Sequence, residues 1–310
     1  MYENLDIARL KYIMTMDCNF RCDYCFEGGK SNKNLNVNEA IVIGKQVLDE
    51  MTQNKLTILY FGGEPLLRFF DVQAITSALT VHAKKIDKDI QFTIITNGSI
   101  LTPLMTNHFK RYKYFVSVSC DGIAAAQDEH RGYKGYKKSF DRVLSTIKIL
   151  NSETKDLCIS MVATKHNVKY LVESFKFFLE EVKINNFAIS PVLDKQQYTP
   201  DPEEYKEQLM RLADLAANCG RKIVLNPPLD KPWEEDNVAR KMAMTSKSVN
   251  IEITPLEVKI VKEVDDKLTI DYGTHAKLQN NPASKELRLA IIGAEKEAQK
   301  YYIELQKERI

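Results

Sequence analysis

The chain has 310 residues, of which 44% are hydrophobic, and its 44 basic and 42 acidic residues leave a formal net charge of +2. This composition supplies a sizeable core and excludes the broad basic surface of a protein held on nucleic acid or on an anionic membrane. No apolar run approaches the roughly 18 residues of a membrane span and no apolar signal segment opens the sequence, so we expect a globular cytoplasmic protein.

Strand-like runs rich in Ile, Val, Phe, Tyr and Thr alternate with segments of helical period over the first two-thirds of the chain. Six strands are predicted, at 10–16, 56–61, 91–96, 114–119, 157–164 and 186–192. Helices are predicted at 37–51, 71–85, 103–111, 139–151, 168–182 and 202–218. Successive strand–helix units with right-handed crossovers build a parallel sheet, whose active site gathers at the carboxyl ends of the strands. The predicted fold is therefore α/β, a partial (β/α)6 barrel.

The pattern changes near Arg221, so we expect two domains: the barrel at 1–220 and a small C-terminal α+β extension at 221–310. Three prolines between 225 and 237 predict a linker or lid. An antiparallel hairpin is predicted from 250–264 and 267–272, with its turn at Asp265 and Asp266, and 284–310 has the pattern of an amphipathic helix. Only about nine residues precede the first predicted strand, so we expect no fused N-terminal peptide-recognition domain.

Three cysteines stand close together directly after the first predicted strand. Cys18, Cys22 and Cys25 have the spacing C-x3-C-x2-C. Three thiolates on one loop can hold three corners of a four-iron cluster, which normally takes four cysteines, so one iron stays open to a substrate or cofactor. The alternatives are a zinc site, for which the nearest histidine in the sequence is His82, and disulfides, which six cysteines in 310 residues do not favour.

A glycine turn, Gly62-Gly63-Glu64-Pro65, follows the second predicted strand. Paired glycines let a ligand approach the backbone and leave N–H and C=O groups to bind it, while Pro65 can open the next helix. The turn is expected on the same edge of the sheet as the cysteine loop. This position makes it a candidate binding site.

Taken together, these motifs resemble the radical S-adenosylmethionine (SAM) enzymes, and specifically the SPASM-type branch of peptide and protein maturases that includes the sulfatase-maturing enzymes. That branch shows C-x3-C-x-aromatic-C, GGEP, TNG, S-x-D-G and H-D-x-x-R in this order. The sequence has Tyr24 before its third cysteine, followed by matching segments at 62–65, 96–98, 119–122 and 127–131. The resemblance covers roughly the first two-thirds of the chain.

The resemblance implies a [4Fe-4S] cluster on the three cysteines and SAM bound to the open iron through its amino and carboxylate groups. One electron from the cluster would cleave SAM to methionine and a 5′-deoxyadenosyl radical, which takes a hydrogen atom from the substrate. By motif position, Gly62, Gly63 and Glu64 would bind the amino group, Ser119 and Arg131 the carboxylate, Asp121 or Asn97 the ribose, and Tyr24 would border the adenine.

The residues also leave local alternatives. Turn capping is the other role for Asn97 and Asp121. Strand alternation places Ser119 on the same face as Ser117, toward the barrel interior. The same alternation turns Cys120 outward.

Departures from the branch bear on the reaction. Gln127 replaces its usual histidine, and Phe61 stands where sulfatase-maturing enzymes carry a glutamine, which weighs against oxidation of a sulfatase cysteine or serine. No cysteine follows Cys219, whereas the branch carries C-terminal cysteines for auxiliary clusters. Cys120, Cys158 and Cys219 are expected to fill the core. Cys120 is nevertheless the candidate catalytic residue, as a thiol that returns a hydrogen atom to a substrate radical.

The resemblance thus implies an oxidoreductase or maturase that modifies a ribosomally made peptide or protein by epimerisation, rearrangement or cross-linking. A peptide would bind the barrel mouth, the C-terminal extension or a separate peptide-recognition protein, and flavodoxin or ferredoxin would be the external one-electron reductant. One alternative is a radical SAM enzyme that acts on a small molecule or nucleotide. The other, a non-catalytic iron–sulfur protein that binds a partner, conflicts with the intact 62–65 motif and Arg131.

Overall fold

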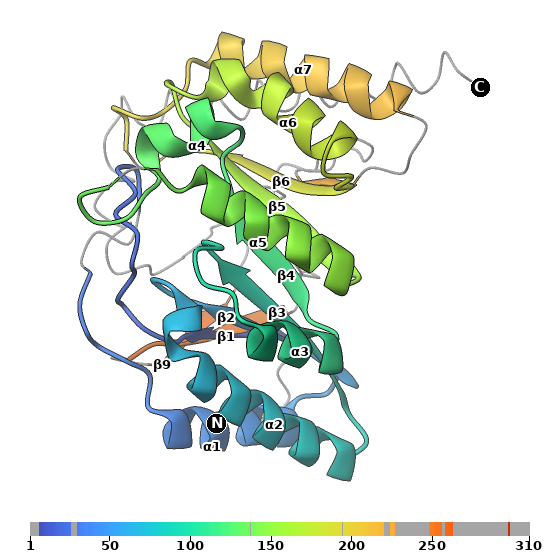
Figure 1. The fold of residues 1–310 in the computed structure, drawn as a ribbon. Helices are drawn as coiled ribbons and strands as arrows, with labels where there is room; N and C mark the ends of the chain where they lie inside the picture. The colour runs from blue at the N-terminus through green and yellow to red at the C-terminus, as the bar shows by residue number, and fades with distance from the viewer. Residues whose placement is uncertain are drawn as a thin grey trace.

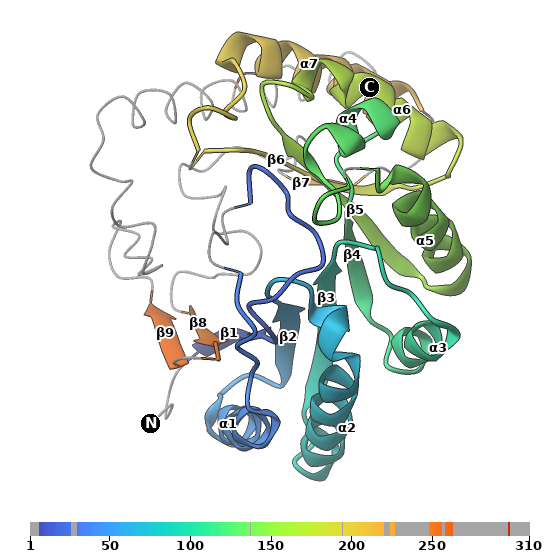
Figure 2. The same cartoon turned by 60° about the vertical axis from the view of Figure 1, so that its left-hand side comes forward.

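A computed structural model describes residues 6–25, 30–136, 138–193, 195–219, 224–226, 248–255, 258–262 and 297. Its described strands form one sheet in the order β7-β6-β5-β4-β3-β2-β1-β8-β9 (Figure 1, with β7 and β8 labelled in Figure 2). Strands β1 to β6 pair in parallel, each with its neighbour in sequence. Turned by 60°, the sheet is seen to curve without closing, with the helices along its outer side (Figure 2).

All six predicted barrel strands are confirmed. The observed bounds of each strand lie within a few residues of the predicted ones. The agreement is close because branched and aromatic residues, which favour strands, mark most of each run. The strands are β1 (Asp6–Ile13), β2 (Lys55–Phe61), β3 (Asp89–Thr96), β4 (Phe115–Ser119), β5 (Asp156–Ala163) and β6 (Asn186–Pro191).

The six helices predicted between residues 37 and 218 are also present, and capping residues set where several of them begin. Asn36 accepts hydrogen bonds from the N–H groups of the first turn of α1 (Val37–Glu50), and Asp201 does the same for α7 (Pro202–Asn218), where Pro202 opens the helix. Short 3₁₀ turns, η1 (Pro65–Arg68) and η2 (Val168–Tyr170), precede α2 (Phe69–Lys85) and α6 (Leu171–Glu180). Helix α4 (Ala124–His130) was not predicted, and the remaining helices are α3 (Pro103–Arg111) and α5 (Phe140–Glu153).

The core between the sheet and the helices contains buried tyrosines whose hydroxyls are all bonded. Tyr12 donates to the carbonyl of Ala40 on α1 at 2.9 Å. The hydroxyls of Tyr60 and Tyr114 lie 2.9 and 2.6 Å from Thr76 Oγ1 on α2. Because each buried hydroxyl has a partner, the aromatic rings can pack here without the cost of an unpaired polar group. The helices are thereby fixed against the sheet that carries the site.

Segments from the C-terminal third extend both edges of this sheet. Strand β7 (Val224–Asn226) pairs in parallel with β6. At the other edge, β8 (Ser248–Ile253) pairs in parallel with β1, and β9 (Val258–Lys262) pairs with β8 antiparallel. The division into two domains stays a prediction.

The predicted hairpin is wrong in its register. The described strands β8 and β9 pair antiparallel within the segment that was expected to form one strand, and Pro255, just after β8, cannot donate to a ladder. The expected turn at Asp265 and Asp266, the strand at 267–272, most of the linker and, apart from residue 297, the final helix lie outside the described residues. Among the described helices, none has the length and apolarity needed to cross a membrane.

Candidate active site

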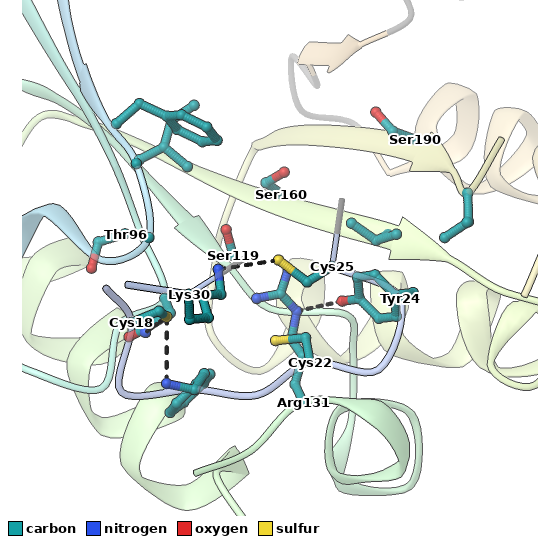
Figure 3. A pocket seen from close by; sticks show the side chains of 18 of the residues that line it. Cys18, Cys22, Tyr24, Cys25, Lys30, Thr96, Ser119, Arg131, Ser160 and Ser190 are labelled. Atoms are coloured by element: carbon teal, nitrogen blue, oxygen red, sulfur yellow. Dashed lines mark hydrogen bonds between the residues drawn. The ribbon is translucent and has the colours of Figure 1, made fainter. Parts of the chain in front are cut away.

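A cavity of about 310 Å³ opens at the carboxyl ends of β2 to β6, and Cys18, Cys22 and Cys25 all line it (Figure 3). Cys18 is buried, while Cys22 and Cys25 are half-buried. The predicted convergence of the cysteine loop and the strand ends is therefore present. The predicted site residues that also line the cavity are Tyr24, Gly62, Gly63, Asn97, Ser119 and Arg131.

The cysteine loop is held by the last residue of α4 and the segment that follows it. The backbone N–H of Arg21 donates to the carbonyl of Gly132 at 2.8 Å, and that of Asp23 donates to the carbonyl of His130 at 3.1 Å. Phe20 and Tyr133 form a further bridge, with their rings edge to face. These contacts bring Arg131 beside the cysteines, although it lies more than 100 residues later in the sequence.

The glycine turn packs against the same loop. This packing corrects the expectation that its backbone N–H groups would be available to bind a ligand. The N–H groups of Gly63 and Glu64 are not free for a ligand, because they donate to the carbonyls of Thr15 and Asp17 at 2.8 Å each. A Cβ on Gly63 would lie 1.9 Å from the Asp17 carbonyl oxygen, and Gly62 has φ +131°. Glycine is thus required at both positions because the turn lies so close to the backbone of Thr15 and Asp17. Gly62 and Gly63 also line the cavity.

Glu64 does not line the cavity. Its buried carboxylate accepts hydrogen bonds from the N–H of Leu66 at 3.0 Å, the hydroxyl of Thr96 at 2.7 Å and the N–H of Asn97 at 2.7 Å. Burial raises the pKa of Glu64 to about 7, against the opposite effect of these hydrogen bonds. The side chain therefore joins the glycine turn to the end of β3.

Tyr24, Asp121 and Arg131 form one buried network beneath the cavity. Arg131 Nε donates to the Tyr24 hydroxyl at 2.5 Å and to Asp121 Oδ1 at 3.0 Å, and the Tyr24 hydroxyl donates to Asp121 Oδ2. The N–H of Val162 on β5 donates to Asp121 at 3.1 Å. Tyr24 and Arg131 line the cavity, whereas Asp121 does not. Asp121 is therefore placed to hold the guanidinium and the phenol and not to meet a ligand.

Asn97 combines two roles that the sequence left open. Its side-chain oxygen accepts from the N–H and hydroxyl of Ser99 at 2.9 and 2.5 Å, which is the predicted turn cap. Its amide nitrogen donates to Asn19 Oδ1 at 2.8 Å and lies 3.7 Å from Cys18 Sγ. Asn97 thus connects the end of β3 to the cysteine loop while it lines the cavity.

Hydroxyl and ammonium groups that the motifs did not indicate also line the cavity. Ser160 on β5 lies directly opposite Ser119 on β4 in the sheet register, and Ser190 stands on β6. Lys30 Nζ donates to Cys25 Sγ at 3.4 Å (Figure 3). Because side chains alternate between the two faces of a strand, the positions of Ser160 in β5 and Ser190 in β6 could have indicated that they face the cavity. Nothing local in the sequence indicates the contact between Lys30 and Cys25.

The structure does not bring Cys120 to the cavity. Its side chain is fully buried behind β4, where its Sγ lies 3.5 Å from the carbonyl oxygen of Gly122, and burial raises its pKa to about 12. Strand alternation, which turns Cys120 away from Ser119, is the reason. Cys158 is buried on β5 and Cys219 lies at the end of α7, so neither lines the cavity.

Comparison with known proteins places this geometry in a family. The model of the radical SAM superfamily matches residues 12–178, so the chain belongs to that superfamily and is an enzyme that uses a [4Fe-4S] cluster and SAM. The predicted superfamily, the prediction of an enzyme and both predicted cofactors are confirmed. The cysteine-type anaerobic sulfatase-maturating enzyme of Clostridium novyi is 29% identical over 216 residues, which cover 64% of this chain and 56% of that enzyme. The chain thus spans little more than half the length of this relative.

Solved structures confirm the predicted barrel. Native anSMEcpe with bound AdoMet and the Cp18Cys peptide superposes with a TM-score of 0.70 at 19% identity, covering 92% of this chain and 83% of that one. Streptococcus suis SuiB bound to the precursor peptide SuiA gives a TM-score of 0.59 at 18% identity, covering 91% and 66%. At these identities the likeness concerns the fold alone.

The residues present fit the two cofactors. Three thiols on one loop face a single cavity, as a cluster with one open iron requires. A guanidinium and a serine hydroxyl in the same cavity have the donors that a carboxylate accepts. Burial raises the pKa of Cys22 to about 11, so this thiol becomes a thiolate through the binding of iron.

Proposed function

We propose that the protein binds one [4Fe-4S] cluster on Cys18, Cys22 and Cys25 and uses it with SAM to modify a peptide or protein. When bound, the two cofactors supply the one-electron chemistry that removes a hydrogen atom from the substrate. The observation that carries the proposal is the convergence of the three thiols with Arg131 and Ser119 on one cavity.

In this proposal the chain's own residues bind and orient SAM. Arg131 and Ser119 bind its carboxylate, and the backbone of Gly62 and Gly63 forms the wall for its amino group. Asp121 acts through Arg131, since it holds the guanidinium from below. Glu64 acts in the same indirect way, because its carboxylate positions the glycine turn against β3.

A peptide is the favoured substrate. Support comes from the C. novyi relative, whose name gives a sulfatase as its target, and from the peptides bound to anSMEcpe and SuiB. The cavity also reaches the end of β6, where Ser190 is exposed and accessible to a chain bound across the barrel mouth. Flavodoxin or ferredoxin is the proposed reductant, and a separate peptide-recognition protein is a further proposed partner.

The positions of the three other cysteines of the given sequence favour redox-neutral chemistry. Cys120 and Cys158 are buried outside the cavity and Cys219 lies at the end of α7, which argues against a second cluster on these three thiols. An enzyme with one cluster has no second iron–sulfur centre of its own to take an electron back from a substrate radical. Epimerisation or rearrangement is therefore proposed ahead of oxidative cross-linking.

The first test is binding of SAM to the reconstituted, anaerobic protein by titration calorimetry. Arg131→Ala removes a charged hydrogen-bond donor worth roughly 1.5 to 3 kcal/mol, so the Kd should rise about tenfold to a hundredfold. Arg68→Ala, which removes a half-buried pair with Asp71 that does not line the cavity, is the matched control and should keep the wild-type Kd. An unchanged Kd in Arg131→Ala removes this residue from the proposed site.

The second test addresses the substrate. Reduced protein and SAM are incubated with precursor peptides encoded beside its gene and, separately, with nucleotides and other small metabolites, and 5′-deoxyadenosine is measured. A peptide that accelerates its formation and changes in mass or stereochemistry supports the proposal. Acceleration by a small molecule alone assigns the enzyme to the small-molecule alternative.

A further inference from the structure

Three side chains converge outside the cavity, where the end of α4 meets the loop after β5. Glu129 and His130 come from the last turn of α4, and His166 comes from that loop. One ligand atom from each lies within 4.8 Å of the others. None of the three lines the cavity, so the cluster of side chains is separate from the proposed SAM site.

His130, the buried member of this group, has an unsatisfied ring nitrogen. Its side chain is 7% exposed, and its Nδ1 lies 3.0 Å from Asp23 Oδ2. An ionised carboxylate can only accept a hydrogen bond, so Nδ1 carries a proton, and in the neutral ring Nε2 presents a lone pair. That Nε2 is buried and has no hydrogen-bond partner in the described part of the chain. Native proteins rarely leave such an atom unpaired, so the missing partner requires an explanation.

The surroundings of His130 match those of a metal-binding imidazole. Histidines that bind metals usually donate their other N–H to a carboxylate, which fixes the ring and its tautomer, and Asp23 has this position. The ring of His166 lies 4.8 Å from that of His130, and the ring of Tyr198 lies 5.3 Å away on the same imidazole. His130 is thus held rigidly, while Glu129 and His166 are exposed and have room to adjust.

We propose that Glu129, His130 Nε2 and His166 bind one divalent transition-metal ion, and that zinc is the best match. Two imidazoles and one carboxylate are a common zinc ligand set, with a position left for water. Calcium and magnesium prefer oxygen ligands throughout, so they fit less well. At bond lengths of 2.0–2.2 Å, tetrahedral ligand atoms stand about 3.4 Å apart. The two exposed side chains must therefore move inward by about 1 Å, which a small change of rotamer provides.

The ion would stabilise the support of the cysteine loop. His130 directly precedes Arg131, and its carbonyl accepts the N–H of Asp23, which directly follows Cys22. A metal bound to His130 and His166 fixes the end of α4 to the loop after β5. Because Asp23 is bonded to both the ring and the backbone of His130, this restraint extends to the cysteine loop.

The experiment is a calorimetric titration of zinc into the protein with its cluster already in place. The wild type is expected to bind one zinc ion per chain, with its iron content unchanged before and after the titration. His166→Ala removes an exposed ligand and should raise the Kd for zinc by tenfold or more. His82→Ala is the matched control, since His82 pairs with Asp49 on a different face and should leave zinc binding intact.

A second readout is the thermal unfolding midpoint. Zinc bound to the native state should raise it in the wild type and in His82→Ala, but not in His166→Ala. Equal zinc affinity in the wild type and His166→Ala overturns the proposal. So does a wild type that binds no zinc, or one that takes up zinc only as it loses iron, since the cysteines would then be the ligands.

Discussion

Arg131 and Asp121 form a buried ion pair beneath the cavity, with Arg131 Nε 3.0 Å from Asp121 Oδ1 and side chains that are 10% and 0% exposed. Two charges taken out of water are stable only where good geometry and further hydrogen bonds compensate the loss of hydration. The Tyr24 hydroxyl and the N–H of Val162 supply those bonds to Asp121. The pair fixes the orientation of the guanidinium that lines the cavity.

Asp121→Asn should therefore destabilise the fold. It leaves the Arg131 charge buried without a counter-ion, which costs about 3 kcal/mol of unfolding free energy. Urea unfolding followed by circular dichroism measures this loss. Glu153→Gln is the control, because it breaks the exposed pair with Lys110 and should cost less than about 1 kcal/mol. An equal loss of unfolding free energy in the two variants would show that the buried pair stabilises the fold no more than the exposed pair does.

Gly63→Ala should prevent assembly of the cluster. The new Cβ would lie 1.9 Å from the Asp17 carbonyl oxygen, so the glycine turn and the cysteine loop must separate. Iron per chain after reconstitution is the measurement, and it should fall well below the wild-type value. In Gly135→Ala the Cβ meets no atom within 4 Å, and only the φ of +76° is strained, so iron content should be kept. Normal iron content in Gly63→Ala contradicts the close approach.

Much of this fold could be predicted because local signals agreed with the tertiary structure. Pro103 and Pro202, each preceded by a capping side chain, mark the starts of α3 and α7. Helix α4 has only seven residues, too few for its periodicity to show. In the hairpin, Pro255 was the available signal for the end of the first strand, but the strand-like alternation of apolar and charged residues continued on both sides of it.

The site was predicted less completely, because hydrogen-bond partners depend on packing between distant segments. The motif placed Glu64 beside the ligand, yet its carboxylate accepts hydrogen bonds from Thr96 and Asn97 at the end of the next strand. The N–H of Gly63 is likewise used by Thr15. Ser160 becomes a cavity residue only through the register of β5 against β4, which one sequence does not specify.

Lys30→Met should lower the reduction potential of the cluster. The ammonium of Lys30 lies 3.4 Å from Cys25 Sγ, and a charged hydrogen bond to a ligand sulfur stabilises the more negative, reduced state. A redox titration monitored by electron paramagnetic resonance measures the shift. Lys33→Met removes an exposed lysine of the same loop and should have a smaller effect. Identical potentials in the two variants would count against the contact.

His108 should make the fold sensitive to acid. Burial among aromatic rings lowers its pKa from 6.5 to about 4, so the folded state keeps the ring neutral. The neutral ring contributes to the free energy of unfolding above pH 6.5, and this contribution is lost as the pH falls toward 4. The reason is that the unfolded chain binds a proton on this histidine at a higher pH than the folded protein does. Between pH 7.5 and 5.5 this amounts to about 1 kcal/mol of unfolding free energy.

His108→Phe should remove that part of the pH dependence, which urea unfolding at the two pH values measures. His82→Phe is the control, because His82 lies on α2 beside Asp49 and outside this aromatic group. If His108→Phe loses as much stability as the wild type between the two pH values, His108 is not the group responsible.

The most direct test of the central claim is the iron content of the reconstituted protein. If Cys18, Cys22 and Cys25 hold the one cluster, the wild type should contain about four irons per chain. Replacing all three by Ala should remove essentially all iron and the visible charge-transfer absorbance, and Cys22→Ala alone should abolish the formation of 5′-deoxyadenosine. A triple variant that still holds about four irons would contradict the account, because a second cluster would then exist on other residues.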